Sequence, residues 1–378
     1  MLLSKQWLLA ILFCTLQASA AYAAPTPTTT RCPGEKITHT FSSGASWQMC
    51  VQLRQAEGIA LTQVYYQAIG HESRRVLGEI SLSQLETVFD NTTATPQYHV
   101  TQTGLGKQLQ TMAPTDCPNG HLHALGGSKQ VLCRIAQQSG YQYKYTEQRQ
   151  GEFVDLLSHS YIAPRTYTLR WRFYENGIIE PALGMSGQLP KTAGLTDSFT
   201  DHLGWRIDFD LGSQQQDDLV EEVSSQPTAD RLRKTVHVTP ILEEAGRLLD
   251  PENKRFWRIR DGNNHYAGGL VIPSYELITS NYNHSRNNAR NQPWLSHDIY
   301  FTRYKACERY AAHNLTSNCA SNAFRYVETP ESLNGADVII WYKQSYHHLL
   351  RSDDNIRVGM VWNTFQLLPR DWHNQNPF

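Results

Sequence analysis

Histidine and cysteine are the residue types in this chain that could bind a transition metal. Among histidines outside other motifs we considered His121, His123, His159, His284 and His297, and the only ligand-like spacing in this set is His121-x-His123. This pair lies between Cys117 and Cys133, and we interpret it as part of a solvated loop rather than as a metal site. Cys-x-x-Cys does not occur, which argues against a zinc site made of cysteines.

The cysteines are better explained by disulfides. Cys14 lies in an apolar N-terminal run, and the other six form three close pairs along the chain: Cys32/Cys50, Cys117/Cys133 and Cys307/Cys319. Several connectivities are possible for six cysteines, so the sequence alone does not prove that neighbours pair. In an oxidising compartment three local loops are the economical arrangement.

The first 23 residues have the pattern of a secretory signal peptide. Lys5 precedes the apolar run Trp7–Leu16, and small residues follow at possible cleavage sites. The run is too short to span a membrane, and no later stretch is long and apolar enough to do so. We therefore expect a signal peptide over residues 1–23, a disordered Pro/Thr-rich tail over 24–30, and a secreted or periplasmic protein.

Charge and composition narrow the class of the remaining chain. The 378 residues carry 34 basic and 35 acidic side chains, for a net charge of −1, and no basic block occurs. Nucleic-acid binding therefore has no electrostatic basis here. Since no repeat or low-complexity linker marks a boundary, we expect one large domain over residues 31–378. Ser213–Asp230, the most polar stretch, is predicted to be a long loop or an exposed hairpin.

The hydrophobic periodicity is mostly that of β-strands. In TYTLRWRFYENGIIEPAL apolar and polar residues alternate around Glu175-Asn176-Gly177, which predicts a hairpin. Helical patterning is limited to short pieces such as Leu82–Phe89 and Pro240–Leu249, with Pro240 at a first helical position. The predicted fold is mainly β: a large antiparallel β-sandwich of two packed sheets with a few short helices.

Several segments resemble, in the same order, the catalytic domain of the copper amine oxidases. Trp47–Tyr66 (WQMCVQLRQAEGIALTQVYY) is similar to its opening, WRFYENGIIEPALGMSGQL to the quinone hairpin, and FTDHLGWRIDFDL to the metal-binding strand. DVIIWYKQSYHHLLRSDD and FQLLPRDWHNQNP are similar to its C-terminal end. The resemblance implies the catalytic β-sandwich alone, a disulfide between Cys117 and Cys133, and a homodimer.

In that family a tyrosine is oxidised, with copper and oxygen, to topaquinone. The quinone forms a Schiff base with a primary amine, and an aspartate removes the α-proton. The resemblance places the quinone at Arg165, the base at His99, and a tyrosine that hydrogen-bonds the quinone at Gly78. Arginine cannot become a quinone, whereas a neutral histidine could still accept a proton.

The three copper positions fall at Phe199, Asp201 and His348. A phenylalanine has no lone pair for a metal, and a single carboxylate is a poor substitute for an imidazole at copper. A shift of one residue would make His202 a ligand, but the Arg-x-Asp-x-Asp pattern that follows argues against this shift. The substitutions therefore argue against both copper and topaquinone.

A second, structural cation site of the family is retained in the sequence. The resemblance places its carboxylates at Asp208, Asp210 and Asp337, and its backbone oxygens at Phe209 and Val338. Such hard oxygen ligands suit Ca²⁺. The competing interpretation is that the aspartates lie at strand ends and are satisfied by a neighbouring arginine or by turns.

Three functional hypotheses follow. The leading one is a secreted, catalytically degenerate relative of the copper amine oxidases that is retained for binding or for structure. The second is an active primary amine oxidase, for which Ser280-Asn281-Tyr282-Asn283 imitates a quinone motif, although its composition is that of a turn. The third is a redirected enzyme that holds another metal with Asp201, His202 and His348.

Overall fold

A computed structural model describes residues 31–91, 94–127, 129–189, 191–192, 195–212, 217–229, 234–262, 272–279, 292–315, 318–352, 354 and 357–372. The predicted signal peptide and tail, and the motif Ser280–Asn283, lie outside these residues. Cys32–Phe378 form a compact unit. Among the described residues, no helix is both long enough and apolar enough to cross a membrane.

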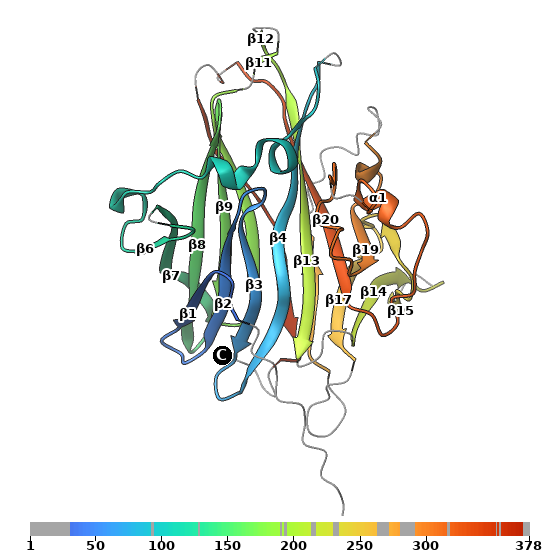
Figure 1. Cartoon of the computed structure of the whole chain (residues 1–378). Coiled ribbons are helices and arrows are strands. Elements are labelled where there is room, and N and C mark those ends of the chain that lie inside the picture. Colours follow the sequence, from blue (N-terminus) through green and yellow to red (C-terminus); the bar gives the residue numbers. More distant parts are fainter. Residues whose placement is uncertain are drawn as a thin grey trace, which may run out of the picture. The chain divides into compact units, whose positions relative to one another are not determined.

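Two large antiparallel sheets make up this unit (Figure 1). The nine-stranded sheet has the order β1 (Glu35–Thr40), β2 (Ser46–Arg54), β3 (Gly58–Gln67), β4 (Ser73–Phe89), β13 (Phe199–Gly212), β20 (Val338–His348), β19 (Ile299–Arg303) and β16 (Ala245–Arg247), with β5 (Gln97–Tyr98) paired to β4.

The eleven-stranded sheet has the order β15 (Lys234–Pro240), β14 (Asp218–Pro227), β17 (Phe256–Asp261), β18 (Ser274–Ile278), β22 (Gln366–Arg370), β10 (Ile179–Gly187), β9 (Arg165–Tyr174), β8 (Gln148–Ile162), β7 (Gln130–Lys144) and β6 (His121–Ala124), with β21 (Val358–Thr364) on β10. The short strands β11 (Lys191–Thr192) and β12 (Leu195–Thr196) pair with each other.

Helical segments are short. Those in the described part of the chain are η1 (His99–Thr103), η2 (Leu105–Gln108), η3 (Pro114–Asp116), η5 (Pro293–Leu295) and α1 (Ala323–Tyr326). The predicted class, a mainly antiparallel β protein of two sheets with few helices, is confirmed.

The core between the two sheets is filled by large aromatic side chains. Trp171 from β9 meets Trp205 from β13 edge to face, with ring centroids 5.6 Å apart, and both are fully buried. Burial alternates along much of β9, as the sequence pattern predicts for a strand with one face on the core. The predicted hairpin at Glu175-Asn176-Gly177 is confirmed, because β9 pairs with β10 around it and Gly177 adopts a φ of 92°.

Two helix predictions are wrong. Leu82–Phe89 is the second half of strand β4, where every residue is buried. Both faces of this half of the strand are buried, so its polar residues do not mark a solvent face. The apolar residues Leu82, Leu85 and Val88 therefore recur at a spacing of three, which is the spacing of a helix. Pro240–Leu249 contains the end of β15 and the three-residue strand β16 instead of a helix.

The region between Cys117 and Cys133 also differs from its prediction as a solvated loop. His121 and His123 lie on β6, which is hydrogen-bonded to β7. Disulfides join Cys32 to Cys50, Cys117 to Cys133 and Cys307 to Cys319, which is the neighbour pairing.

Candidate functional site

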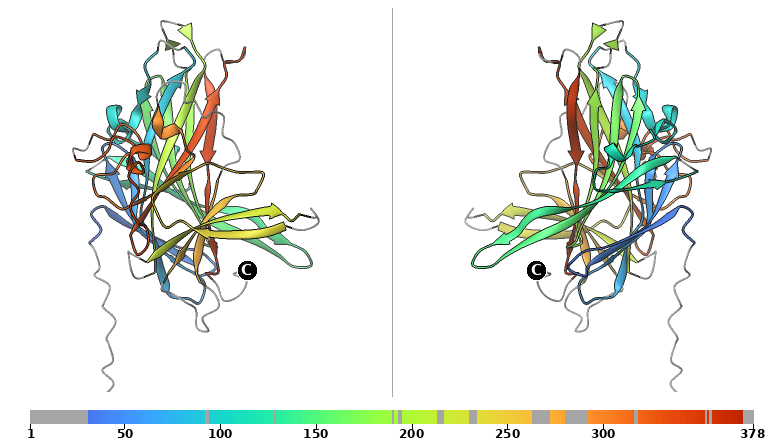
Figure 2. Two further views of the ribbon diagram at one scale, coloured as in Figure 1. Left: turned by 90° about the vertical axis from the view of Figure 1, so that its right-hand side faces the viewer. Right: turned by 90° about the vertical axis from the view of Figure 1, so that its left-hand side faces the viewer.

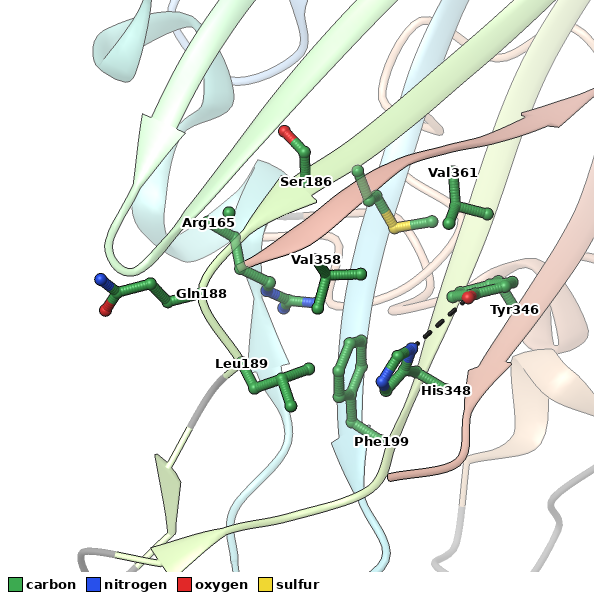
Figure 3. Close-up of a pocket in the computed structure, with 11 residues that line it drawn as sticks. Arg165, Ser186, Gln188, Leu189, Phe199, Tyr346, His348, Val358 and Val361 are labelled. Atoms are coloured by element: carbon green, nitrogen blue, oxygen red, sulfur yellow. Dashed lines mark hydrogen bonds between the residues drawn. The ribbon is translucent and has the colours of Figure 1, made fainter. Parts of the chain in front are cut away.

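Sheet register gathers several of the predicted site residues at one end of β13. Phe199, the first residue of β13, lies opposite His348, the last residue of β20. On the other side of β13, Asp201 lies opposite Thr87 of β4. Arg165, the first residue of β9 in the other sheet, points toward this end of β13 (Figure 3).

Arg165 and Asp201 form a buried ion pair. Arg165 Nη1 donates to Asp201 Oδ2 at 2.7 Å, and the two side chains are 6% and 0% exposed. Arg165 Nη2 donates to the Thr87 hydroxyl at 2.7 Å, and that hydroxyl donates to the other Asp201 oxygen. Burial opposes the guanidinium charge, but the Asp201 carboxylate outweighs it and raises the pKa of Arg165. The Arg165 guanidinium therefore keeps its charge, with the Asp201 carboxyl group in direct contact.

His99 lies beside this pair. Its Nε2 is 3.0 Å from the Thr87 hydroxyl and 3.5 Å from Arg165 Nη2. Burial, together with the Arg165 charge, lowers the pKa of His99 to about 3, so the ring is neutral at physiological pH. The His99 ring is therefore a poor proton acceptor, because its protonation would place a second cation beside the Arg165 guanidinium in a buried site.

The other two copper positions form an aromatic stack. The rings of Phe199 and His348 are nearly parallel, with centroids 5.4 Å apart and an interplanar angle of 19°. The Arg165 guanidinium carbon lies 4.6 Å from the centroid of Phe199, so the phenyl ring is in contact with both the cation and the imidazole. His348 Nε2 is 2.9 Å from Asp354 Oδ2, which occupies a nitrogen that would otherwise be available to a metal.

A small cavity borders this stack (Figure 3). It is lined by Arg165, Met185, Ser186, Gly187, Gln188, Leu189, Phe199, Tyr346, His348, Val358 and Val361. Its volume is about 20 Å³, which is room for about one water molecule. As lined by the described residues, the cavity next to Arg165 is therefore smaller than an amine substrate needs.

Two residues considered for this site lie elsewhere. Gly78 is on β4, nine positions before Thr87, and a side chain there would meet Asp208 rather than Arg165. The structure thus corrects its expected contact with position 165: the β4 residue that touches Arg165 is Thr87. His202 is paired with Ser345, its Nδ1 2.8 Å from the Ser345 hydroxyl, on the opposite side of β13 from its neighbour Asp201.

The three aspartates of the expected calcium site lie toward the other end of β13. Burial raises the pKa of Asp208, as do the charges of Asp337 and Asp210, and burial raises the pKa of Asp337 to about 6. Two arginines accompany these carboxylates: Arg75 is ion-paired with Asp210, and Arg206 Nη1 is 3.9 Å from Asp208 Oδ2.

Phe209 and Val338, expected to supply backbone oxygens there, lie in β13 and β20 with buried side chains. Across the described parts of the chain, no group of three or more His, Cys, Asp or Glu side chains is arranged to hold a metal ion.

Comparison with known proteins agrees with this architecture. The family model for the copper amine oxidase enzyme domain matches residues 42–378. The chain is 22% identical to a primary amine oxidase and to a copper methylamine oxidase, both from Arthrobacter sp. (strain P1). These alignments cover 90% of this chain and 60% of each relative, so the chain spans about 60% of the length of these curated relatives.

Solved structures show the same fold. A copper-containing benzylamine oxidase from Hansenula polymorpha superposes with a TM-score of 0.76 at 16% identity, over 88% of this chain and 59% of that chain. An amine oxidase from Aspergillus nidulans gives a TM-score of 0.72 at 17% identity, over 94% and 56% of the two chains. At these identities the likeness establishes the fold and nothing finer.

Proposed function

Because this chain belongs to the copper amine oxidase family, we propose that it is an exported member that no longer oxidises amines and is retained for binding or for structure. The observation that carries the proposal is the buried Arg165–Asp201 ion pair with Phe199 stacked beside it. By resemblance, these residues stand where the quinone and two copper ligands belong. In place of those groups, the Arg165 guanidinium and the Asp201 carboxylate pair with each other, so the cluster needs no further ion.

Copper does not fit the donor set at this position. Only His348 offers an imidazole, and its Nε2 already contacts Asp354. The Asp201 carboxylate is engaged by Arg165 and Thr87, and Phe199 offers only a ring face. A divalent cation would also have to displace the Arg165 guanidinium, since two cations would otherwise share one buried carboxylate.

Export is supported by the signal-like N-terminus and by the three disulfides. Disulfides persist in secreted and periplasmic proteins and are rare where thiols are kept reduced. The corresponding check is cell fractionation with mass spectrometry of the mature N-terminus, which we expect near residue 24.

Calcium at Asp208, Asp210 and Asp337 is proposed from the resemblance. The raised pKa values of Asp208 and Asp337 are the behaviour of carboxylates that lack enough compensating charge. Arg75 and Arg206 supply part of that charge without a metal.

A homodimer is likewise proposed from the resemblance, and two hairpins support it. The β7–β8 and β14–β15 hairpins extend to the same side in Figure 2. They expose apolar or aromatic side chains: Tyr145 is 88% and Val236 63% exposed. Such side chains on extended arms suit contact with a second copy. Light scattering coupled to size exclusion should give twice the chain mass.

The activity proposal is tested with protein incubated with copper and oxygen. We expect no peroxide from methylamine or benzylamine, no visible quinone band, and no coloured adduct with phenylhydrazine, because Arg165 cannot form the cofactor. An active copper amine oxidase treated in parallel is the positive control. A stoichiometric coloured adduct would overturn the proposal and would direct the search for the modified side chain to Tyr161 and Tyr167.

A further inference from the structure

We propose that His121 and His123 on β6 bind a zinc-type divalent cation, with Glu35 as the residue that orients His123. The two histidines are separated by one residue on a strand, so their side chains project from the same face. Their ring centroids are 4.7 Å apart. Imidazole pairs are ligands preferred by Zn²⁺, Cu²⁺ and Ni²⁺ over Mg²⁺ or Ca²⁺.

His123 is held in the way that metal-binding histidines usually are. Its Nδ1 lies 2.5 Å from Glu35 Oε1, and Glu35 is on β1, at the edge of the other sheet. A carboxylate that accepts the Nδ1 proton fixes the tautomer and leaves the lone pair of Nε2 available to a metal. The bond also joins the two sheets at this edge, so it sets the direction of the ring.

The second ring nitrogen of His123, Nε2, has no hydrogen-bond partner among the described residues. This atom is buried, and the His123 side chain is only 10% exposed. A buried polar atom without a partner costs free energy, so such an atom calls for a ligand. His121, by contrast, is exposed, and its ring can turn to meet a cation that His123 holds.

The positive charge of Arg134, which lies across the β6–β7 ladder, is directed away from the proposed metal site. Arg134 lies opposite His121 across the β6–β7 ladder. Its Nη1 donates to the Thr38 carbonyl at 3.1 Å, which draws the guanidinium toward β1. His121 and His123 supply the two protein nitrogens. Water reaches the cation once the exposed His121 ring turns and uncovers His123 Nε2, so we expect an open, exchangeable site rather than a closed structural one.

This site is independent of the proposed loss of amine oxidation. It uses β6 and β1, and none of its residues belongs to the cluster around Arg165. Loss of zinc binding would leave the amine assay unchanged, and a positive amine assay would say nothing about zinc. Because Cu²⁺ also favours imidazole pairs, copper titrations aimed at His348 should use a chain that carries His121→Ala and His123→Ala.

The test is zinc titration calorimetry on the full chain purified without a histidine tag. We expect one saturable Zn²⁺ site per chain. His121→Ala and His123→Ala should each weaken the affinity at least tenfold, and Glu35→Gln about tenfold through loss of the orienting carboxylate. His347→Ala is the matched control, since His347 is a partly exposed histidine on β20 that contacts Asp90 and takes no part in the β6–β1 contact. This variant should bind zinc as the parent does.

Folding of each variant is checked by its thermal unfolding curve. His121 is exposed, so His121→Ala keeps the test valid even if His123→Ala does not fold. Absence of a one-to-one site in the parent chain, or unchanged affinity in His121→Ala, would overturn the proposal.

Discussion

The buried carboxylates at the two ends of strand β13 differ in how far their negative charge is compensated by neighbouring side chains. Near its start, Asp201 is matched by one guanidinium and one hydroxyl, and Arg165 keeps its charge. Toward its end, burial and the charges of Asp337 and Asp210 raise the pKa of Asp208. One end is therefore complete without any ligand, whereas the other has more acid than its arginines neutralise.

Under the proposed loss of copper, this difference is how the architecture would be kept without its transition metal. A site whose substitutions carry opposite charges can close on itself, because the new side chains compensate each other. A site that retains only its acids stays dependent on a cation or on protons. The dependence of each end on its compensating charge can be measured by removing that charge: the arginine at one end, and calcium or protons at the other.

The largest effect is expected from Arg165→Met, which leaves Asp201 buried without its cation. Removing one partner of a buried ion pair typically costs about 3–5 kcal/mol. Urea unfolding should show this loss, and Arg165→Met combined with Asp201→Asn should recover most of it because the charge is then gone. Arg325→Met, which breaks the exposed pair with Glu328, is the control and should cost at most about 1 kcal/mol. Equal losses for Arg165 and Arg325 would contradict a buried, mutually dependent pair.

At the other end of β13 the expected effect comes from calcium. A cation bound only by the folded chain stabilises it by about 2.7 kcal/mol at a hundredfold excess over Kd. For a chain of this size the melting temperature should rise by a few degrees. Asp337→Ala should abolish the rise, and Arg165→Met should leave it intact. Identical melting curves with calcium and with chelator would show that Arg75 and Arg206 suffice.

Without calcium, the same end should respond to pH. The pKa of Asp337 is raised by burial to about 6 from its ordinary value of 3.8. The folded chain therefore holds this proton to a higher pH than the unfolded chain does, so stability should fall as pH rises from about 4 to about 6. In chelator, Asp337→Asn should flatten that decline. A slope in this pH range that is the same for parent and variant would place the titration on other groups.

The sequence allowed the sheets to be predicted because strand alternation and the Asn-Gly turn are local signals. It did not reveal that Leu82–Phe89 is a strand, since burial on both faces removes the alternation. The positions of Arg165, Asp201, Phe199 and His348 followed from motif order, but their contacts depend on the register between strands far apart in the chain.

Other contacts had weaker signals or none. Two replaced positions with opposite charges, Arg165 and Asp201, were a usable hint of a compensating pair. Nothing in the sequence pointed to Thr87 or Asp354, because a threonine within a strand and an aspartate in a polar turn are ordinary. The contact between His123 and Glu35 could not be predicted, because Glu35 is 88 residues away on the other sheet.

The smallest effect concerns the phenylalanine that replaces a copper ligand. Phe199→Leu keeps most of the apolar volume but removes the ring that faces the Arg165 guanidinium and the His348 imidazole. A cation–π contact is worth about 0.5–1 kcal/mol at exposed sites and about 2 kcal/mol or more when desolvated. Phe153→Leu is the matched control, because Arg172 lies over that ring at 3.8 Å but is 19% exposed. Both changes lose similar apolar surface, so the excess loss at Phe199, about 1 kcal/mol in urea unfolding, reports the desolvated cation. Equal losses at the two positions would mean that Phe199 only fills space, and that Asp201 and Thr87 hold the buried arginine without help from the ring.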